Sequence, residues 1–350
     1  MNPEQRISTF VQLGKAFRAL SASDEWPGYD CGLTREEFSQ WQEAVKLAGI
    51  RNGWFTAESV RKAFSSWGDA LEESSLTEWL ASYPEWKKEK APKNVGIIAA
   101  GNIPLVLLHD VISTVLAGHQ ALVKLSSDDE ILFRNIHQTL IQWDQNWAEL
   151  ITIVPARLEG YDAMIATGSD NTSRYFEYYF RNIPSIIRKN RNSIAILDGT
   201  ESAEELSGLG HDIFDHFGLG CRSVTKIYVP AGYDPDTFFR GIFQFSDIVN
   251  HNKYANNYDY NKAVWLLNRE DLLDNGFILL RRSEDIASPT GSIYWEEYDS
   301  LENLKLHLDS LKDKIQCITG HGFIPFGMAQ CPSLRDYADG VDTMQFLLSL

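Results

Sequence analysis

The sequence predicts an α/β protein in which a helical N-terminal region precedes two doubly wound domains with mostly parallel sheets. Apolar residues recur at helical spacing up to about residue 90, and short apolar segments alternate with helical ones after it. Polar residues typical of binding sites follow several of the predicted strands. We therefore expect a helical region at 1–90, α/β domains at 91–198 and 199–319, and a segment at 320–350 that returns to the domain junction.

Composition restricts the class of protein. The 350 residues are 44% hydrophobic, enough to fill at least two cores, and the formal net charge of -16 opposes binding to nucleic acid or to an anionic membrane. No leader segment and no apolar run of about 18 residues is recognisable, so we expect a soluble, cytoplasmic protein without a membrane span. The four cysteines show neither metal-ligand nor disulfide spacing, so we predict reduced thiols and no metal.

Local signals define the helical region. Thr34 and Glu37 form a capping-box pattern, and Thr56 is expected to cap a helix over 57–67. The charged stretch 87–93 is expected to be a connector, because it contains a proline and the sequence pattern changes after it.

In the first α/β domain, the expected strands are 95–98, 121–124, 150–154, 163–166 and 193–197. The expected helices are one that starts at Pro104 and is closed by Gly118, one over 128–143 and one over 171–180. Asn102, Lys124 and Gly168 fall at or just after strand ends. Because ligands bind at the carboxyl ends of parallel strands, we expect these three residues at one binding edge.

In the second domain, helical stretches over 201–206 and 211–217 lead to Cys221. The expected strands are 226–229, 263–267, 277–280, 293–295 and 315–319, with a helix over 301–311. The polar and aromatic run 250–258 is predicted to be a loop that either faces a substrate or caps itself at the surface. An apolar-ended segment over 339–350 closes the chain.

Cys221 is the candidate nucleophile. Gly218 and Gly220 allow a tight turn that leaves its sulfur uncovered, and the thiolate is the strongest nucleophile among ordinary side chains at neutral pH. A buried structural cysteine is the alternative interpretation. His211 and His216 are five residues apart and do not share a helix face as metal ligands; His216 either assists Cys221 or is an ordinary polar residue near a helix end.

Each residue at a predicted strand end has a functional and a structural interpretation. Asn102 can donate to an oxyanion, or it can cap the helix that starts at Pro104. Lys124 can meet ribose hydroxyls or a phosphate, or it can be neutralised by the nearby Asp128, Asp129 and Glu130. The turn Thr167-Gly168-Ser169 can hold phosphate at a helix N-terminus, or it can be a plain N-cap.

Five segments follow one another along the chain: Gly101-Asn102-Ile103-Pro104, Ala121-Leu122-Val123-Lys124-Leu125-Ser126, Ala166-Thr167-Gly168-Ser169, Cys221 and Pro325-Phe326-Gly327. In this order they resemble the aldehyde dehydrogenase superfamily and, within it, the acyl-CoA reductase branch typified by the LuxC component of bacterial luminescence. The resemblance makes 91–198 the dinucleotide-binding domain and 199–319 the catalytic domain. It implies that Cys221 is the nucleophile and Asn102 an oxyanion donor, and that the cofactor is held by Lys124, Ser126, Thr167, Gly168 and Ser169.

Departures from the family pattern bear on the chemistry. The glutamate that activates water in hydrolytic members has no counterpart in 188–193, which favours acyl exchange with a thiol such as CoA. A second glutamate, which holds the nicotinamide ribose, is missing before Pro289. The stretch 86–95 leaves little room for the hairpin through which superfamily members usually dimerise, so a homo-oligomer is left open.

The resemblance implies a function. It indicates an NADPH-dependent enzyme that reduces a fatty acyl-CoA, or an acyl-protein thioester, to the aldehyde through an S-acyl-Cys221 intermediate. Two alternatives stay open: a non-acylating aldehyde dehydrogenase, and an inactive, scaffold-like relative that keeps the fold.

Overall fold

The computed structural model describes residues 1–88 and 90–350 and divides them into two compact units. Unit 1 comprises Met1–Lys189 and Ser333–Leu350, and unit 2 comprises Asn190–Pro332. Residue 89, in the predicted connector, lies outside the described residues. The boundary between the two units falls after residue 189, whereas the predicted boundary between the two α/β domains was after residue 198. The strand predicted at 193–197 pairs in the second sheet and therefore belongs to unit 2.

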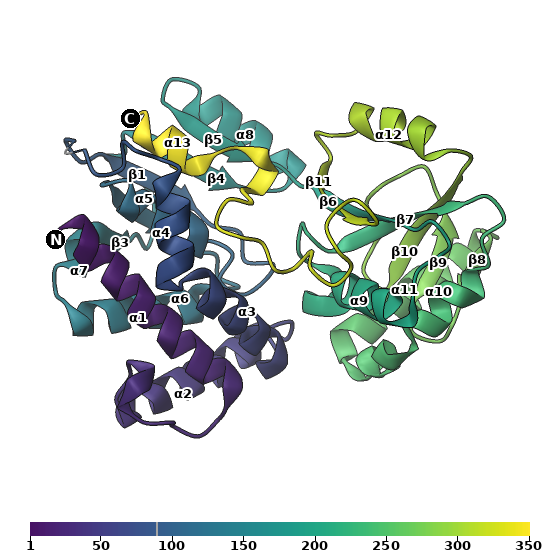
Figure 1. Cartoon of the computed structure of the whole chain (residues 1–350), viewed down its shortest axis with the longest axis horizontal. Helices are drawn as coiled ribbons and strands as arrows, with labels where there is room; N and C mark the ends of the chain where they lie inside the picture. Colours follow the sequence, from purple (N-terminus) through teal and green to yellow (C-terminus); the bar gives the residue numbers. More distant parts are fainter. Residues whose placement is uncertain (89) are drawn as a thin grey trace. The chain divides into compact units, whose positions relative to one another are not determined.

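Residues 1–88 form four α-helices, drawn in purple and blue in Figure 1. Side chains cap two of the predicted helices: Thr34 accepts the backbone N–H of Glu37, and Thr56 accepts that of Ser59. The predicted capping box is confirmed, since the Glu37 carboxylate also accepts the backbone N–H of Thr34 at 2.7 Å. The elements are α1 (Pro3–Ala22), η1 (Tyr29–Cys31), α2 (Arg35–Arg51), α3 (Ala57–Ala70) and α4 (Glu73–Ala81).

A five-stranded sheet follows in unit 1, with all its strand pairs parallel and in the order β3-β2-β1-β4-β5. The strands are β1 (Asn94–Ile98), β2 (Gln120–Lys124), β3 (Ile151–Ile153), β4 (Ala163–Thr167) and β5 (Ser185–Arg188). The helices between them are α5 (Leu108–Leu116), α6 (Glu130–Trp143), α7 (Trp147–Leu150) and α8 (Asp170–Phe180). The first four strands agree with the prediction, whereas β5 was not predicted.

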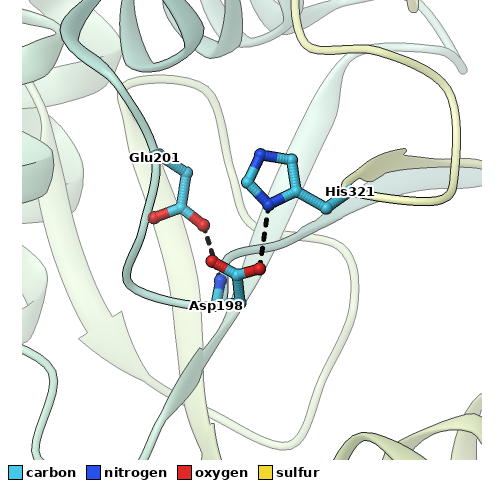
Figure 2. A group of neighbouring side chains, drawn as sticks. All are labelled: Asp198, Glu201 and His321. Carbon is cyan, nitrogen blue, oxygen red and sulfur yellow. Dashed lines mark hydrogen bonds and ion pairs between the residues drawn. The ribbon is translucent and has the colours of Figure 1, made fainter.

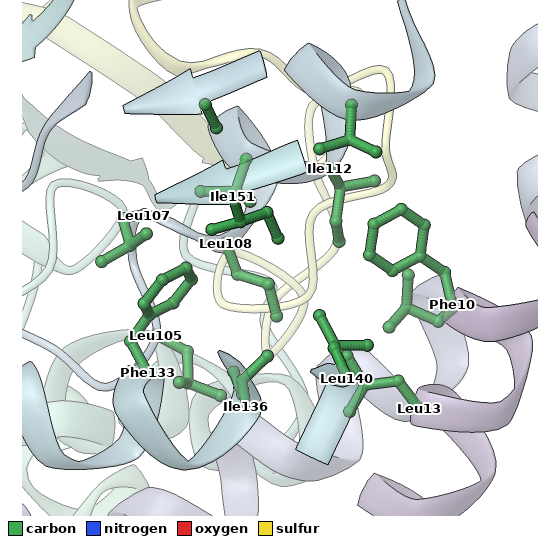
Figure 3. Close-up of a cluster of buried hydrophobic side chains, with 14 of the residues drawn as sticks. Phe10, Leu13, Leu105, Leu107, Leu108, Ile112, Phe133, Ile136, Leu140 and Ile151 are labelled. Atoms are coloured by element: carbon green, nitrogen blue, oxygen red, sulfur yellow. The ribbon is translucent and has the colours of Figure 1, made fainter. Parts of the chain in front are cut away.

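One hydrophobic cluster joins the N-terminal helices to this sheet. Phe10 and Leu13 on α1 lie near Ile112 on α5 and Leu140 on α6, and all four are buried (Figure 3). After η4 (Ala338–Gly340), helix α13 (Thr343–Leu348) adds to the same cluster Met344, Leu347 and Leu348. Burial of one such side chain contributes about 1.5–3 kcal/mol. The beginning and the end of the chain therefore stabilise the first sheet directly.

Helix α5 begins at Leu108 and not at Pro104. Residues 104–107 form turns instead, and Leu105 has a left-handed backbone with φ 60°. This conformation costs a non-glycine residue about 1–2 kcal/mol. The backbone N–H of Leu105 donates to the Asp129 carboxylate at 2.7 Å, which holds the turn in place. Asn102 is therefore not the cap of α5, and that interpretation was wrong.

Unit 2 contains a six-stranded sheet in the order β11-β6-β7-β10-β9-β8, parallel except for the pair β8 and β9. Its strands are β6 (Asn192–Ile196), β7 (Val224–Pro230), β8 (Leu272–Asp274), β9 (Leu279–Arg282), β10 (Ser292–Tyr298) and β11 (Ile315–Gly320). Its helical elements are α9 (Ala203–Phe214), η2 (Asp215–Gly218), α10 (Pro235–Gly241), η3 (Phe243–Asn250), α11 (Asn252–Leu267) and α12 (Leu301–Ser310).

Helix α11 replaces both the loop predicted over 250–258 and the strand predicted over 263–267. The His251 side chain caps the helix by accepting the backbone N–H of Tyr254 at 3.3 Å. A short apolar run does not by itself distinguish a strand from a buried part of a helix. The informative signal was the helical spacing of the residues that α11 buries, namely Tyr254, Tyr258, Asn261 and Trp265.

All four cysteines are free thiols: Cys31 and Cys317 are buried, Cys221 is half-buried and Cys331 is exposed. In the described ranges, no helix combines the length and the apolarity of a membrane-spanning segment.

Candidate active site

Cys221 lies on a turn between α9 and β7 in unit 2. Three consecutive residues before it have left-handed backbones: His216 (φ 53°), Phe217 (φ 58°) and Gly218 (φ 74°). Glycine adopts this conformation freely, but each of the other two costs about 1–2 kcal/mol. Backbone strain of this kind persists where the surrounding structure holds it, and it is concentrated at functional sites. The sequence pointed only to glycines here, whereas His216 and Phe217 carry the strain.

Ser193 on β6 anchors the backbone of Cys221. Its hydroxyl donates to the Cys221 carbonyl at 3.0 Å and accepts the backbone N–H of Cys317 at 3.2 Å. Ser193 and Cys317 are both buried, whereas Cys221 is half-buried. The structural interpretation of a cysteine therefore fits Cys317. Cys221 has the partial exposure that a reactive thiol needs.

A narrow pocket of about 20 Å³, which is room for about one water molecule, lies beside this turn within unit 2. Phe217 and Gly218 line it from the turn, Tyr254 lines it from α11, and Thr290 lines it from the segment before β10. The polar run 250–258 therefore contributes Tyr254 to a pocket wall, from a helix instead of a loop.

In unit 1, the predicted oxyanion donor Asn102 and the predicted cofactor residues lie along one edge of the sheet. Lys124 is the last residue of β2, Thr167 is the last residue of β4, and Asn102 follows β1. Because β1 lies between β2 and β4 in a parallel sheet, the three segments emerge at the same edge. The segment of Asn102 passes close to Ser126, since a Cβ added to Gly101 would lie 2.7 Å from the Ser126 Cβ.

Lys124 is exposed at this edge. The acidic residues proposed to neutralise it have other contacts: Asp129 accepts the N–H of Leu105, and Glu130 pairs with Arg134 at 3.4 Å. Within residues 1–88 and 90–350, no carboxylate forms an ion pair with Lys124. The Lys124 ammonium can therefore meet a ligand that carries hydroxyl or phosphate groups.

Ser169 is the N-cap of α8. Its hydroxyl accepts the backbone N–H of Thr172 at 3.4 Å. Ser169 therefore caps the helix, as the structural interpretation predicts. Gly168 lies against the same helix, because a Cβ there would be 3.0 Å from Thr172 and Phe176. The N-terminus of this helix lies at the same sheet edge as Lys124. Helix N-termini in such positions are typical phosphate-binding sites.

Asp129 supports the segment that carries Asn102. It is buried, and burial raises its pKa well above the usual range. Its Oδ2 accepts the N–H of Leu105, while its Oδ1 has no hydrogen-bond partner among the described residues. The sequence offered Asp129 only as a counter-ion for Lys124, and its observed contact is with the backbone of another segment.

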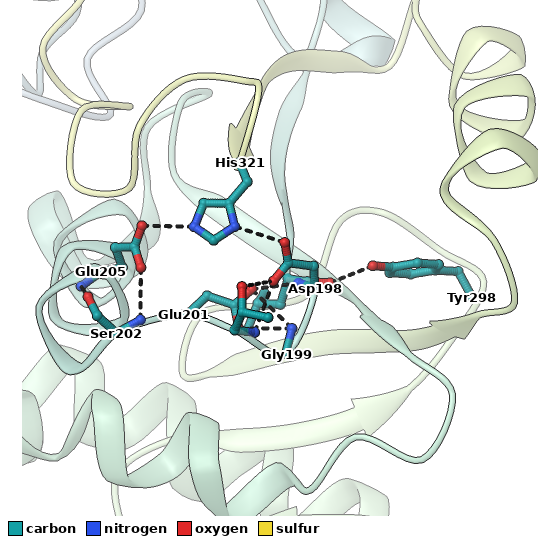
Figure 4. Close-up of polar contacts among 9 residues, drawn as sticks. Asp198, Gly199, Glu201, Ser202, Glu205, Tyr298 and His321 are labelled. Atoms are coloured by element: carbon teal, nitrogen blue, oxygen red, sulfur yellow. Dashed lines mark hydrogen bonds and ion pairs between the residues drawn. The ribbon is translucent and has the colours of Figure 1, made fainter.

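A polar cluster that the sequence did not reveal lies at the carboxyl ends of β6 and β11 (Figure 2). Nδ1 of His321 contacts Asp198 and its Nε2 contacts Glu205, both at 2.8 Å (Figure 4). These hydrogen bonds raise the pKa of His321 to about 9, and hydrogen bonds from Thr200 and His321 lower the pKa of Asp198 to about 2. Asp198 and His321 are 123 residues apart, so no local pattern predicts this contact.

This cluster also has the donor types of a metal site. Ligand atoms of Asp198, Glu201 and His321 lie within 4.8 Å of one another. However, both ring nitrogens of His321 are engaged with carboxylates, and the single positive charge of the imidazolium offsets part of their negative charge. We therefore assign an ion-pair cluster.

Comparisons with solved structures define the class of the protein: it has the fold of the aldehyde dehydrogenases. An NAD-dependent aldehyde dehydrogenase from Sinorhizobium meliloti matches with a TM-score of 0.60 at 10% identity, over 91% of this chain and 70% of that chain. An NADP-dependent enzyme from E. coli matches with a TM-score of 0.62 at 13% identity, over 91% and 73%. An aldehyde dehydrogenase from Bacillus cereus, solved with NAD+, matches with a TM-score of 0.61 at 11% identity, over 91% and 72%. The predicted fold class is confirmed.

The sequence profile of the acyl-CoA reductase (LuxC) family matches residues 58–239, which include both Asn102 and Cys221. The chain belongs to this family, so it is an oxidoreductase, and the predicted family is confirmed. Among proteins of curated function, none matches the chain in sequence.

Proposed function

We propose that the protein reduces a fatty acyl thioester, either acyl-CoA or an acyl-protein, to the aldehyde with NADPH, through an S-acyl intermediate on Cys221, in the cytoplasm. The observation that carries the proposal is the strained turn that presents the half-buried thiol of Cys221 in a chain of the acyl-CoA reductase family. Thioester exchange at such a thiol splits one difficult reduction into two easier steps.

In the first step, the Cys221 thiolate attacks the carbonyl carbon of the thioester, and the electron pair of the C=O bond moves onto the oxygen. The side-chain amide of Asn102 and the backbone N–H of Cys221 are the proposed donors to that oxyanion. When the carbonyl re-forms, the bond to the leaving thiolate breaks, and this thiolate takes a proton from solvent. Cys221 then carries the acyl group as a new thioester.

The residues at the edge of the first sheet fit a nicotinamide dinucleotide. The exposed ammonium of Lys124 and the hydroxyl of Ser126 would hold a ribose or a 2′-phosphate, and the start of α8 after Thr167-Gly168-Ser169 would hold the pyrophosphate. A nicotinamide cofactor held by these residues would supply the hydride that reduces the acyl carbon. The oxyanion that results re-forms a carbonyl, the C–S bond breaks, and aldehyde leaves as the Cys221 thiolate is regenerated.

Residues 188–193 support a reductive outcome over hydrolysis. This stretch holds no carboxylate that could activate water. Its first residue, Arg188, is buried and forms a bidentate pair with Asp110 at 2.6 and 2.7 Å. Such a pair is structural and supplies no base, so an acyl group on Cys221 would be hydrolysed slowly.

Intact-mass analysis tests the nucleophile. The protein is incubated with a medium-chain acyl-CoA without cofactor, next to the variants Cys221→Ala and Cys331→Ala. We expect one acyl mass on the wild type and on Cys331→Ala, which lacks the other thiol that is not buried, and no added mass on Cys221→Ala. Acylation of Cys221→Ala would contradict the proposal. Absence of acylation for every acyl-CoA and acyl-protein donor would favour an inactive relative.

The Asn102→Ala variant tests the oxyanion donor. Loss of one such donor typically slows the chemical step about 100-fold or more. Asn102 is exposed and does not cap α5, and a thermal melt of the variant measures what its side chain contributes to stability. Single-turnover acylation and a thermal melt, recorded on the same sample, separate these two effects.

A further inference from the structure

A buried carboxylate in unit 2 holds the closing segment 325–330, which contains Pro325-Phe326-Gly327. Asp212 on α9 is fully buried, and its two oxygens accept the backbone N–H groups of Gly327 at 2.8 Å and of Ala329 at 2.9 Å. Each carboxylate oxygen thus fixes one peptide of the segment. Charge-assisted bonds of this kind are about twice as strong as bonds between neutral groups.

Helix α9 is shaped to receive this segment. Gly208, one turn before Asp212, packs against the segment's backbone, because a Cβ at position 208 would lie 2.8 Å from the carbonyl oxygen of Phe326. Gly327 in turn has a φ of 86°, and a Cβ there would lie 3.1 Å from the Cα of Gly208. The two glycines allow the two backbones to approach, and Asp212 ties them together.

The same segment is bonded to the residues that follow Cys221. The Arg222 guanidinium donates to the carbonyl of Ala329, and the Gln330 amide donates to the Ser223 hydroxyl at 3.1 Å. Arg222 and Ser223 are the next two residues after Cys221. Segment 325–330 therefore bridges α9, which leads into the strained turn, and the start of the strand that leaves it.

We propose that Asp212 is a positioning residue for acyl transfer: by fixing segment 325–330 to α9, it sets the position of the Cys221 thiol. This inference rests on the proposed role of Cys221 as nucleophile. A nucleophile misplaced by about 1 Å can lose about 100-fold in rate, even when the change lies away from the reacting atoms. Asp212 touches neither the thiol nor any group assigned to the substrate, so it acts through the segment that it holds.

The protonation of Asp212 agrees with this role. Desolvation by burial raises the pKa of Asp212 to about 6, and the two N–H donors oppose that rise. A buried carboxylate is unfavourable unless its oxygens are paired. Both oxygens of Asp212 are paired in this way, because each accepts one backbone N–H of the closing segment.

Two variants test the inference in a Cys331→Ala background, which leaves Cys221 as the one thiol that is not buried. Asp212→Asn removes one of the two acceptor oxygens, and Gly208→Ala displaces the same segment without a change of charge. Glu204→Gln, on the exposed face of α9, is the matched control. We measure single-turnover acylation by a medium-chain acyl-CoA, its dependence on acyl-CoA concentration, and alkylation of Cys221 by iodoacetamide from pH 6 to 10.

We expect Asp212→Asn and Gly208→Ala to lower the maximal acylation rate at least about 10-fold, with half-saturation changed less than about 3-fold. They should also alter the pH profile of alkylation, which loss of stability alone would leave unchanged. If Asp212→Asn folds and has the acylation rate and the alkylation pH profile of the wild type, the inference is overturned. If Asp212→Asn does not fold, the same two results for Gly208→Ala would overturn it. If acyl-CoA and acyl-protein both fail to modify the parent protein, the proposed function falls, and the alkylation profiles still decide the role of Asp212.

Discussion

Each unit holds a segment of the candidate site in place through one buried carboxylate, and the two carboxylates differ in how they are paired. Asp129 in unit 1 accepts one backbone N–H, that of Leu105, and its second oxygen has no partner among the described residues. Asp212 in unit 2 accepts two backbone N–H groups, one on each oxygen. Both are buried, yet the pKa of Asp129 is raised well above its usual range, and that of Asp212 rises only to about 6.

Desolvation is the largest cause of both shifts, and the two sites differ in how many N–H donors oppose it. Burial disfavours the ionised form of both carboxylates, and each N–H donor offsets part of that cost. With two donors, Asp212 can bind its segment as a carboxylate at neutral pH. With one donor, the charge of Asp129 is less fully compensated, so its hold on the Asn102 segment should depend less on charge.

Asp110 is a third buried carboxylate, and both of its oxygens are paired with a cation. Its removal should have the largest effect on stability. Asp110 forms two bonds to the guanidinium of Arg188, which also donates to Thr343 at 3.0 Å. Asp110→Ala leaves the Arg188 charge buried, and we expect a loss of about 3–5 kcal/mol in the free energy of unfolding. Urea denaturation measures it. The double variant Asp110→Leu with Arg188→Met should recover most of the loss, and an equally unstable double variant would contradict this account.

Asp212 should make stability depend on pH. Its folded-state pKa of about 6 lies above the usual value of 3.8, so its contribution to stability is present below about pH 4 and is lost as the pH rises through 6. That rise corresponds to at most about 3 kcal/mol. The difference in unfolding free energy between wild type and Asp212→Asn, measured by urea denaturation from pH 4 to 8, should shrink accordingly. His211 and Asp215 also act on this carboxylate, so Asp215→Asn serves as a control for their influence.

Asp129 should respond differently to the two simplest substitutions. Asp129→Ala leaves the N–H of Leu105 buried without an acceptor, which should cost about 1–3 kcal/mol. Asp129→Asn keeps an acceptor and removes the ionisable group, so its stability should stay within about 1 kcal/mol of the wild type. Thermal melts of both variants decide the point. A large loss for Asp129→Asn would show that the charge itself holds this segment.

The exposed cluster around His321 should show the smallest effect. Its folded-state pKa of about 9 lies above the usual 6.5, so its stabilising contribution is complete below about pH 6.5 and is lost as the pH rises through 9. Solvent screens such exposed pairs strongly. A His321→Gln variant should therefore melt slightly below the wild type at pH 7 and together with it at pH 10. A difference that persists at pH 10 would rule out the ion pairs as its cause.

Local signals in the sequence were sufficient for most of the fold. The capping box at Thr34 and the alternation of strands and helices both correspond to elements of the structure. Two errors have a common cause, because short segments carry little periodicity. Strand β5 (Ser185–Arg188) ends only a few residues before β6 (Asn192–Ile196), and nothing local shows that the two strands belong to different sheets. The apolar end of α11 resembles a strand when it is considered alone.

The site was predictable where strand ends position it, and not where distant contacts do. Asn102, Lys124 and the turn at Gly168 reach one edge because parallel strands place them there. Their chemical roles, like that of Cys221, stay predictions. The contacts of Asp212 with Gly327 and of His321 with Asp198 join residues more than 100 positions apart. No pattern of spacing within a single helix or strand encodes such pairs.

Unit 1 is discontinuous in sequence, whereas unit 2 is a single continuous stretch. The side chains of Met344 and Leu347 complete the hydrophobic cluster that begins with Phe10. During synthesis on the ribosome, the core of unit 1 therefore stays incomplete until all of unit 2 has been made, which takes roughly 7–30 s at ~5–20 residues per second. The part of the protein that is synthesised first is then the last to complete its hydrophobic core.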